Sequence, residues 1–551
     1  MSEKEVYTTT VQSIASGGTG GEPTAVDSKD GKIVRIRPLH IDEKYTHEEL
    51  ADSMWELDVD GKKFRPEYKA APNYMALAYK ERVYSKNRVM KPLKRVDWEP
   101  GGDPATMNAA NRGKSKFVEI SWDEALDIME SEIKRVIDQY GPYSVLCIGE
   151  DGHRESKDLH AGGGMHMTAM NLLGGYTRET RTPDSVEGWY WGAKHFWGSG
   201  FNRGGGLIAP PQNGYSNHKV IKDVTEWASE RCGIPPHTIK AYARNLCKKR
   251  ASHVHYSSGS IKTPYSHEPG RTQAYLLAMQ GMGKPGVQQL HLEATLVAKE
   301  KLAESSTRPF SLLNHCRMFY PSAQSLPRTA IAEAIRNGHV EWYGSPCIVY
   351  VPTDEQFKKF TYPGDPKMGL MMAQAMAQRA GLPVPTEEPR INPVHMLWSE
   401  KPCNMNCWNG GFEFQDAIRS DEVEFFVTNH QWMENDSLFA DLVLPVTTCL
   451  EDDDTMGASM TVGMRWAGYT PHACDRVGVS KSDWEIALEV LDRFGKREEL
   501  DLGMTTDQWL EYGFANSHLT TEVDWDTLVE KGLYYPKLEE NWRDELPGMR
   551  G

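Results

Sequence analysis

Shortly after Ser121 the hydrophobic pattern changes from a helical period to a continuous apolar run. Ser121 and Glu124 have the spacing of a capping box, and apolar residues then recur on one face until Gly141-Pro142 ends the pattern. Residues 144–149 follow as a short apolar strand. A helix leading into a buried strand is one step of a wound α/β sheet. The polar residues 150–153 are therefore expected just past the carboxyl end of that strand.

A second α/β unit is predicted over roughly residues 340–495, where short apolar runs alternate with helical and polar segments. The predicted strands are Cys347–Val351, His395–Trp398, Phe425–Thr428 and Asp441–Pro445. Polar residues cluster just past these strands: Ser399, Glu400, Asn404, Asn429, His430 and Gln431. Ligands of open α/β sheets bind outside the carboxyl ends of the strands, so the cluster predicts a nucleotide-sized site.

Other elements follow from turn signals and periodicity. An Asp30-Gly31 turn between alternating apolar and polar residues predicts a hairpin. The Met-rich segment 162–175 predicts a helix, whereas residues 199–219, rich in Gly, Pro and Asn, predict a loop or linker. Helices are expected from Val220 onward and around 274–279, with a strand at 253–256. The glycine loop 281–286 fits either the lip of a ligand site or a simple helix stop.

Residues 183–198, PDSVEGWYWGAKHFWG, hold six aromatic-ring residues, counting His195, with glycines at intervals. The proline disfavours helix at the preceding residue, so Asp184-Ser185 is expected on a turn. Glycines allow the backbone to approach a large flat ligand closely. A buried aromatic cluster explains the same pattern, and both interpretations stay open on this stretch alone.

The totals limit the class of protein. At 551 residues, with 39% hydrophobic and 25% charged residues, the chain has the composition of a soluble globular protein of about two to four domains. A net charge of −15 argues against non-specific nucleic-acid binding, which needs clustered Lys and Arg. Nine dispersed cysteines predict reduced thiols. We find neither a signal peptide nor a transmembrane segment, and so expect a cytoplasmic protein.

Four short segments allow two interpretations each. The basic stretch 82–98 suits an anionic ligand or a solvated face, and Glu451–Asp454 suits a metal ion or, preferably, a solvated acidic loop. The Cys403-x-x-x-Cys407 spacing is only weak evidence for a metal or redox site. The glycine cluster 16–21 fits a phosphate cradle or a flexible entry, but it lacks the features of a P-loop.

Several segments together match one family in the same order. They are Tyr84, Arg88, Lys91–Arg95, Ile120–Ala125, Tyr140–Pro142, Gly281–Gly286 and Phe439–Pro445. This set resembles the DMSO reductase family of molybdopterin oxidoreductases. Pro183-Asp184-Ser185, followed by Glu-Gly-Trp and Trp-Gly, resembles the pyrogallol–phloroglucinol transhydroxylase type of large subunit within that family. The segments Thr19–Gly21 and Asp30–Ile33 resemble the same type.

The resemblance implies a molybdenum (or tungsten) ion held by two molybdopterin guanine dinucleotides, with Ser185 as an oxygen ligand to the metal. A highly charged metal deprotonates a coordinated hydroxyl, and the cofactor carries the difficult chemistry. His153 and Asp184 match the family's acid/base pair. The residues expected to bind the cofactor are Ser121, Trp122, Gly283, Lys284, Ser399, Asn404, Asn429, Gln431 and Asp441. No cysteine precedes Cys147, so no iron–sulfur cluster is expected on this chain.

The resemblance also implies the fold class: α/β, with Rossmann-like doubly wound units around a central cofactor cleft. One such unit is expected to be missing where Gly204–Gly206 and a linker stand, and the family's C-terminal β-barrel is expected to be missing after Gly551. A catalytic tyrosine has no convincing match, Tyr320 being the nearest. The expected domains are a β-rich cofactor-entry domain at 1–110, an α/β domain with the metal site at 111–339 (shortened at 199–219), a second, pterin-guanine binding α/β domain at 340–500 and a C-terminal tail at 501–551.

Three functions remain open on this basis. The first is a hydroxytransferase acting on polyhydroxylated aromatics, in which a metal-bound phenol exchanges protons with His153 and Asp184. The second is another oxidoreductase of the family, such as a reductive catechol dehydroxylase. The third is a truncated, non-catalytic binding or assembly subunit. A small ferredoxin-like iron–sulfur subunit is the expected partner, and neither nucleic acid nor a membrane is expected.

Overall fold

The computed structural model describes residues 7–15, 21–59, 61–70, 72, 74–149, 159–160, 164–180, 224–251, 253–255, 267–281, 287, 289–291, 324–344, 358–367, 369–371, 374, 384–400, 403–407, 410–456 and 466–538. The chain divides into two compact units. Unit 1 comprises Met1–Thr182, Val297–Ile348 and Asp354–Glu540. Unit 2 comprises Pro183–Leu296, Val349–Thr353 and Asn541–Gly551.

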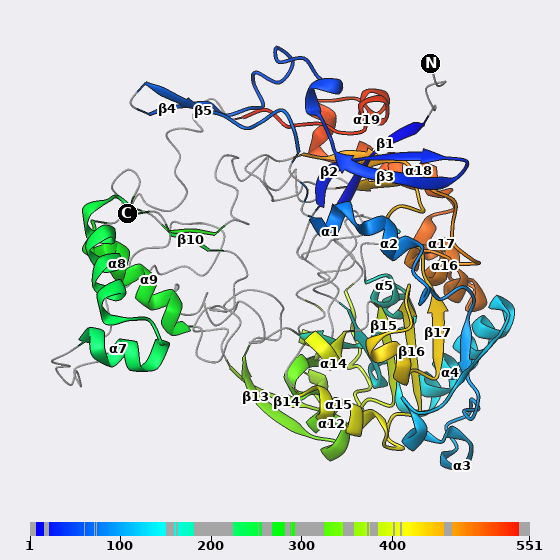
Figure 1. Ribbon diagram of the computed structural model, residues 1–551. Helices are drawn as coiled ribbons and strands as arrows, with labels where there is room; N and C mark the ends of the chain where they lie inside the picture. Colours follow the sequence, from blue (N-terminus) through cyan, green and yellow to red (C-terminus); the bar gives the residue numbers. More distant parts are fainter. Residues whose placement is uncertain are drawn as a thin grey trace. The chain divides into compact units, whose positions relative to one another are not determined.

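An eight-stranded mixed sheet forms the centre of unit 1 (Figure 1). Its strands, in spatial order, are β12 (Gln324–Pro327), β9 (Thr177–Thr180), β8 (Val145–Ile148), β15 (Met396–Glu400), β16 (Phe425–His430), β17 (Leu442–Pro445), β6 (Leu93–Arg95) and β7 (Phe117–Glu119). The first six strands pair in parallel, and β6 and β7 add an antiparallel edge. The α/β fold class predicted from the sequence is confirmed.

Helices cover both faces of this sheet. Alternate strand residues point to opposite faces, so Trp398 packs with α4, α5 and α16, whereas its neighbour Leu397 packs with α12 and α15. Because both faces are buried, inner parallel strands such as β8 are continuous apolar runs, and all four residues of β8 are buried. The covering helices are α4 (Trp122–Tyr140), α5 (Met165–Leu172), α12 (Ile331–Asn337), α15 (Gly411–Ile418) and α16 (Asp483–Arg493).

Helix α4 and strand β8 lie where the sequence predicted them. Ser121 caps α4 by accepting a hydrogen bond from the backbone N–H of Glu124 at 3.1 Å. Strand β8 pairs with β15, although these strands come from the two α/β units that we expected to meet near residue 339. The two expected units therefore share one sheet. The pattern of a single strand does not reveal this, because parallel neighbours can be far apart in the sequence.

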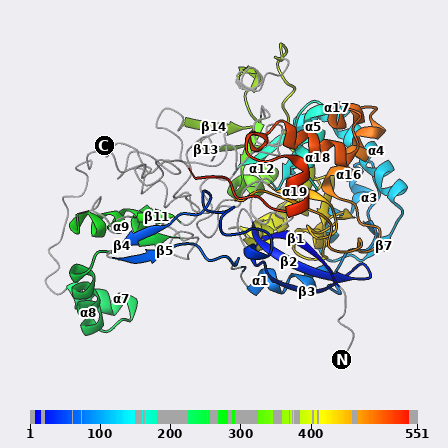
Figure 2. The ribbon, with the colours of Figure 1, turned by 90° about the horizontal axis from the view of Figure 1, so that it is seen from above.

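A three-stranded antiparallel sheet, β1 (Thr8–Ala15), β2 (Gly21–Lys29) and β3 (Lys32–Pro38), precedes the central sheet in the chain (Figure 2). The predicted hairpin is confirmed: Asp30 and Gly31 both have positive φ angles, 51° and 70°, as a tight type I′ turn requires. The short helices α1 (Tyr74–Leu77) and α2 (Tyr79–Val83) pack against β3.

The remaining elements of unit 1 are short. The strand pairs are β4 (Leu57–Val59) with β5 (Lys62–Phe64), β13 (Val340–Gly344) with β14 (Lys358–Tyr362), and β18 (Asp454–Met456) with β19 (Gly468–Thr470). The helices are α3 (Pro104–Met107), α14 (Asn404–Cys407), α17 (Arg497–Asp501), α18 (Thr506–Ala515) and α19 (Trp525–Lys531). The 3₁₀ turns are Ile41–Glu43, Ala109–Asn111, Pro142–Ser144, Arg328–Ala330, Asn435–Phe439 and His518–Thr521.

The segment after residue 501 is folded over most of its described length and differs from the tail that we expected. Helices α18 and α19 bury Phe514 and Leu528 against Ala467, next to β19. The acidic and aromatic residues of this segment gave no strong period. Two caps nevertheless start helices there, because Thr505 and Asp524 accept N–H bonds from Gln508 and Thr527.

Unit 2 is described through helices α7 (Val224–Cys232), α8 (Pro236–Lys248) and α9 (His267–Met279) and strands β10 (His253–His255) and β11 (Gln289–His291). Strands β10 and β11 pair in parallel with α9 between them in the chain, which makes a βαβ unit. The predicted strand at 253–256 and the helices on either side of it are confirmed in position. None of the described helices is long and apolar enough to cross a membrane.

Glu424 holds α4 to the amino edge of the central sheet. Burial opposes its ionisation, but hydrogen bonds from His395, Tyr140 and Arg135 outweigh burial and lower the pKa of Glu424 to about 2. Tyr140 donates to one carboxylate oxygen at 2.6 Å, and Arg135 pairs with the other oxygen and also with Glu132.

This lowered pKa predicts a specific acid sensitivity. An acid whose folded pKa lies below its unfolded value contributes stability above the unfolded pKa, here about 4.5, and loses that contribution as the pH falls toward 2. We expect Glu424→Gln to flatten the pH dependence of the urea midpoint in this window. An equally steep decline in the variant and the parent chain would contradict the assignment.

Candidate functional site

The central sheet reverses its winding between β8 and β15. From β8 the chain continues to β9 and β12 on one side, whereas β15, β16 and β17 extend the sheet on the other side. Ligands of open α/β sheets bind beyond the carboxyl ends of the strands at such a switch point. In this chain the switch point is bordered by Gly149, directly after β8, and by Ser399 and Glu400 at the end of β15.

Gly149 is held closely at this point. Its backbone N–H donates to Glu179 Oε2 at 3.2 Å, and its φ angle of 124° is one that favours glycine. A Cβ atom at this position would collide with the backbone oxygen of Glu400. His153 is the fourth residue after Gly149 in the chain. The position of Gly149 therefore fixes where residues 150–153 begin, and those four residues themselves lie outside the described residues.

Two buried carboxylates lie beneath the strand ends. Glu179 on β9 pairs with Arg328, which directly follows β12, at 2.9 Å. Glu400 accepts N–H bonds from Gly164, Met165 and His166 at the start of α5. The three N–H groups are among those that a helix N-terminus leaves without an intrahelical partner, so they stabilise the negative charge of Glu400.

The polar cluster predicted after β15 and β16 lies together at the carboxyl edge. Asn429 links its neighbours: its Oδ1 accepts from Trp398 Nε1 at 3.1 Å, and its Nδ2 donates to Asp483 at 3.1 Å. Gln431 donates to the carbonyl of Thr447 at 3.0 Å. The hydroxyl of Ser399, fully buried, has no hydrogen-bond partner among the described residues. A buried polar atom without a partner is costly, so it points to a missing ligand or water.

Asn404 lines a pocket of about 280 Å³ near this edge. The amide Nδ2 of Asn404, which is 6% exposed, also lacks a hydrogen-bond partner among the described residues, while its backbone N–H donates to Asp436 at 2.9 Å. The remaining lining residues are Arg328, Thr329, Ala332, Glu333, Arg336, Gly410, Glu413 and Phe414. Donors, acceptors and one aromatic ring are therefore available to a small polar ligand.

Three further predicted cofactor residues have structural contacts. Ser121 caps α4, and Trp122 Nε1 donates to the carbonyl of Val479 at 2.7 Å. Asp441 is fully buried, and its carboxylate receives hydrogen bonds from Arg95, Arg112 and the backbone N–H of Phe426. These contacts explain the three residues without a cofactor, and their cofactor roles stay predictions.

The predicted catalytic and metal residues His153, Asp184 and Ser185 lie outside the described residues, as do Gly283 and Lys284. The strands that lead to them are described. The chain reaches His153 from β8 and Asp184-Ser185 from β9, and these two strands are parallel neighbours. Strands β8 and β9 therefore end at the same edge of the sheet. The aromatic run 189–197, the linker 199–219 and Tyr320 are also outside the described residues.

Two arginines of the basic stretch 82–98 are buried in ion pairs, so they form neither an open anion site nor a solvated face. Arg88 and Arg95 are buried, Arg88 against Glu451 at 2.6 Å and Arg95 against Asp441 and Asp97. Lys91 pairs with Glu119. Charge alone suggested exposure because the acidic partners Asp441 and Glu451 lie more than 300 residues away in the chain.

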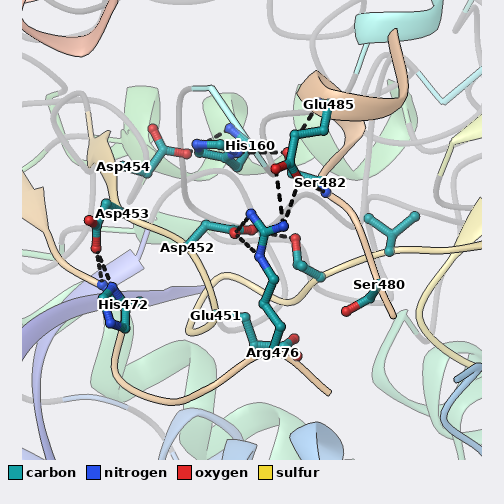
Figure 3. A network of polar contacts seen from close by, with 12 residues as sticks. His160, Glu451, Asp452, Asp453, Asp454, His472, Arg476, Ser480, Ser482 and Glu485 are labelled. Atoms are coloured by element: carbon teal, nitrogen blue, oxygen red, sulfur yellow. Dashed lines mark hydrogen bonds and ion pairs between the residues drawn. The ribbon is translucent and has the colours of Figure 1, made fainter. Parts of the chain in front are cut away.

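The acidic run 451–454 is a structural network, so the preferred interpretation as a solvated loop is wrong (Figure 3). Asp452 pairs with Arg476 at 2.5 Å, and Asp453 contacts His472 at 2.7 Å. Asp454 accepts the backbone N–H of His160 at 2.8 Å, and the His160 ring contacts Ser482. Within the part of the chain that the structure describes, no group of three or more His, Cys, Asp or Glu residues has the arrangement of a metal site.

Cysteines of the described residues are reduced thiols, as the dispersed spacing predicted: Cys147, Cys232, Cys247, Cys403, Cys449 and Cys474. Burial raises the pKa of the Cys147 thiol well above its usual value, and the nearby Glu400 adds to this effect. Cys147 is therefore a neutral core residue and not a nucleophile.

Sequence reasoning missed Glu179, Arg328 and His166, which are buried close to the switch point. The only signal for Glu179 was a charged residue between Thr177 and Thr180, in a segment with no apolar residue. His166 lies inside a Met-rich helix, with Nδ1 3.0 Å from Glu400 Oε1, and gave no signal beyond its residue type.

Two family models match segments of this chain. Residues 88–185 match the family model described as molybdopterin oxidoreductase, and this match ends at the predicted metal ligand Ser185. Residues 22–82 match domain 1 of the pyrogallol hydroxytransferase large subunit-like proteins. The resemblance inferred from the sequence is thereby confirmed. The matches indicate an enzyme, and the family implies a molybdenum–molybdopterin cofactor.

The chain is also similar to individual curated proteins. The pyrogallol hydroxytransferase large subunit of Pelobacter acidigallici is 22% identical over 95% of this chain and 72% of its own length. The trimethylamine-N-oxide reductase of Pasteurella multocida is 35% identical over 22% of this chain and 15% of its own length. Among solved structures, acetylene hydratase from Pelobacter acetylenicus has a TM-score of 0.45 and 14% identity, covering 89% of this chain and 74% of the hydratase.

Proposed function

We propose that the chain is a molybdopterin-dependent hydroxytransferase or oxidoreductase acting on polyhydroxylated aromatic compounds. The observation that carries the proposal is the pair of neighbouring parallel strands β8 and β9. Strand β8, which precedes the His153 segment in the chain, borders the switch point with β15. Its parallel neighbour β9, which precedes Asp184-Ser185, ends at the same carboxyl edge of the sheet, where ligands of α/β sheets bind. The similarity to the P. acidigallici large subunit, whose name refers to pyrogallol, supports the aromatic substrate class.

We propose that the carboxyl edge of unit 1 binds one end of a pterin guanine dinucleotide. The hydroxyl of Ser399 and the amide Nδ2 of Asn404, neither of which has a hydrogen-bond partner within the described part of the chain, would each gain a hydrogen bond from a polar ligand. We propose that Asn429 and Gln431 shape the same edge, and that Gly283 and Lys284 contact a second dinucleotide. Ser185 would provide an oxygen ligand to molybdenum or tungsten.

Bound there, the cofactor supplies a redox-active, Lewis-acidic metal centre. The chain itself orients the substrate and moves protons. We propose that His153 accepts the phenolic proton of the substrate and that Asp184 returns a proton to the oxygen that leaves the ring. Part of the aromatic run 189–197 would line the substrate pocket, since flat rings stack on aromatic side chains.

The proposal also includes a partner subunit and a shortened internal segment. The P. acidigallici relative is named a large subunit, which supports a further subunit in the assembly. We propose that this partner is a small ferredoxin-like iron–sulfur protein, as the family resemblance implies, and that the protein is cytoplasmic. The alignment with this relative spans 679 positions, more than the 551 residues of the chain. The alignment therefore contains gaps, and we propose that one of them corresponds to the shortened Rossmann-like segment expected at residues 199–219.

Metal and pterin analysis of the purified chain, expressed with its cofactor supply confirmed, tests the proposal. We expect molybdenum or tungsten in about equimolar amount, with guanine nucleotide released on denaturation. A chain that folds but binds neither metal would refute both enzyme functions and support a non-catalytic subunit. With metal present, turnover that needs a hydroxylated cosubstrate and no reductant identifies a hydroxytransferase, whereas net consumption of reductant identifies a dehydroxylase.

A further inference from the structure

Three parallel strands meet at one buried carboxylate, that of Glu179. It lies on β9, pairs with Arg328 at the end of β12, and accepts the backbone N–H of Gly149 at the end of β8. We propose that the Glu179–Arg328 pair is a positioning element that fixes where the His153 segment leaves the sheet. The role in catalysis rests on the proposed function, whereas the positioning itself does not.

The geometry of the pair is well suited to this role. Arg328 Nε lies 2.9 Å from Glu179 Oε1, and Arg328 Nη2 lies 3.4 Å from Oε2, the oxygen that also accepts from Gly149 at 3.2 Å. The two side chains are 2% and 1% exposed. Because a planar guanidinium engages both carboxylate oxygens, it holds the carboxylate in one orientation and so aims Oε2 at Gly149.

Gly149 is restrained from its other side as well. The backbone oxygen of Glu400 occupies the space that a Cβ atom at residue 149 would take. Glu400 is in turn fixed, since its carboxylate accepts N–H bonds from Met165 at 3.2 Å and His166 at 2.7 Å. Gly149, the last described residue before the segment 150–153, therefore has two fixed neighbours, Glu179 on β9 and Glu400 on β15.

Stability alone does not explain a charged pair at this place. Two apolar residues of similar volume at the sites of a buried ion pair are often equally or more stabilising. What the ion pair adds is a defined geometry, because it links the ends of β8, β9 and β12. In the chain, β8 and β9 directly precede the segments that contain the predicted site residues. Arg328 and Asn404 line the same pocket, so the position of Arg328 also affects the shape of that pocket at the carboxyl edge of the sheet.

Hydrogen exchange of the full-length chain, followed by mass spectrometry, tests the positioning. Glu179→Gln keeps the size of the side chain but removes its charge. We expect the Gly149 amide, followed in a peptide that starts upstream within β8, to exchange about tenfold faster, because its hydrogen-bond acceptor loses its charge. Glu424→Gln is the matched control, since it disrupts an ion-paired carboxylate at the opposite, amino edge of the same sheet and should leave this peptide unchanged.

Kinetics of the loaded enzyme give the second readout. A positioning role predicts a lower kcat for Glu179→Gln with little change in KM, and partial rescue by Glu179→Asp, which retains the charge. If Glu179→Gln does not fold, Arg328→Lys replaces it in both measurements. Unchanged exchange at Gly149 in a folded variant would overturn the inference. Faster exchange in a chain that binds no metal would refute the proposed function and leave the positioning intact.

Discussion

Replacing Asp441 by alanine is expected to destabilise the fold by about 3–5 kcal/mol, the cost of breaking a buried ion pair by removing one partner. Asp441 lies immediately before β17, and its side chain has no exposed surface. The paired Arg95 and Arg112 side chains are fully buried too. Without the carboxylate, two guanidinium groups would remain in the interior with a reduced set of partners.

The contacts of Asp441 explain why the loss should be large. Arg95 Nε donates to Oδ1 at 3.0 Å, while Arg112 donates through Nε at 3.1 Å and through Nη2 at 2.5 Å. The backbone N–H of Phe426 adds a fourth bond at 2.9 Å. One carboxylate thus connects the β6–β7 edge, the turn at Arg112 and the start of β16. Asp441→Asn, which keeps an acceptor oxygen, should lose less than Asp441→Ala.

Urea unfolding measures this effect, and Asp138→Ala is the control. Asp138 pairs with Lys134 on the exposed face of α4, and both side chains are 63% exposed. An exposed pair of this kind contributes about 0.3–0.5 kcal/mol. If Asp441→Ala unfolds within about 1 kcal/mol of the parent chain, the buried cluster is less important than its geometry indicates.

Local sequence patterns were sufficient to predict those elements of the fold that are determined by residues close together in the chain. The cap at Ser121, the apolar run of β8 and the Asp30-Gly31 turn are each decided within a few residues, and each was predicted correctly. Strand β9 was not predicted, because its sequence TRET carries no apolar pattern. Two of these buried polar residues have partners elsewhere in the chain: Glu179 pairs with Arg328, and Thr177 donates to the carbonyl of Tyr143.

The same reason explains the errors over charged stretches. Arg88 and Glu451 each looked like part of a surface run, yet they form one ion pair with 1% and 0% exposure. A sequence pattern reports residue types in order, but not which distant charges will meet. By contrast, the polar residues after β15 and β16 were placed correctly at the carboxyl edge, because parallel winding brings strand ends together regardless of sequence distance.

Ser185→Ala is expected to lower metal occupancy, and with it turnover, by more than about tenfold. Replacing residues that only support a metal ligand commonly costs 10–100-fold in affinity or activity, and loss of a ligand should cost at least as much. Ser185 comes five residues after the end of β9 in the sequence, and β9 ends at the same edge of the sheet as its parallel neighbour β8. Inductively coupled plasma analysis of the purified variant measures occupancy directly.

Two further variants separate ligation from other roles of the serine. Ser185→Cys should retain much of the metal, because a thiolate is itself a metal ligand. Ser131→Ala is the matched control: the hydroxyl of Ser131 donates only to the carbonyl of Ile128 within α4, at 3.0 Å. Metal content that is equal in Ser185→Ala, Ser131→Ala and the parent chain would exclude Ser185 as a ligand. Loss of metal in Ser185→Ala with retention in Ser185→Cys would identify residue 185 as a metal ligand, because the thiolate replaces the hydroxyl in that role.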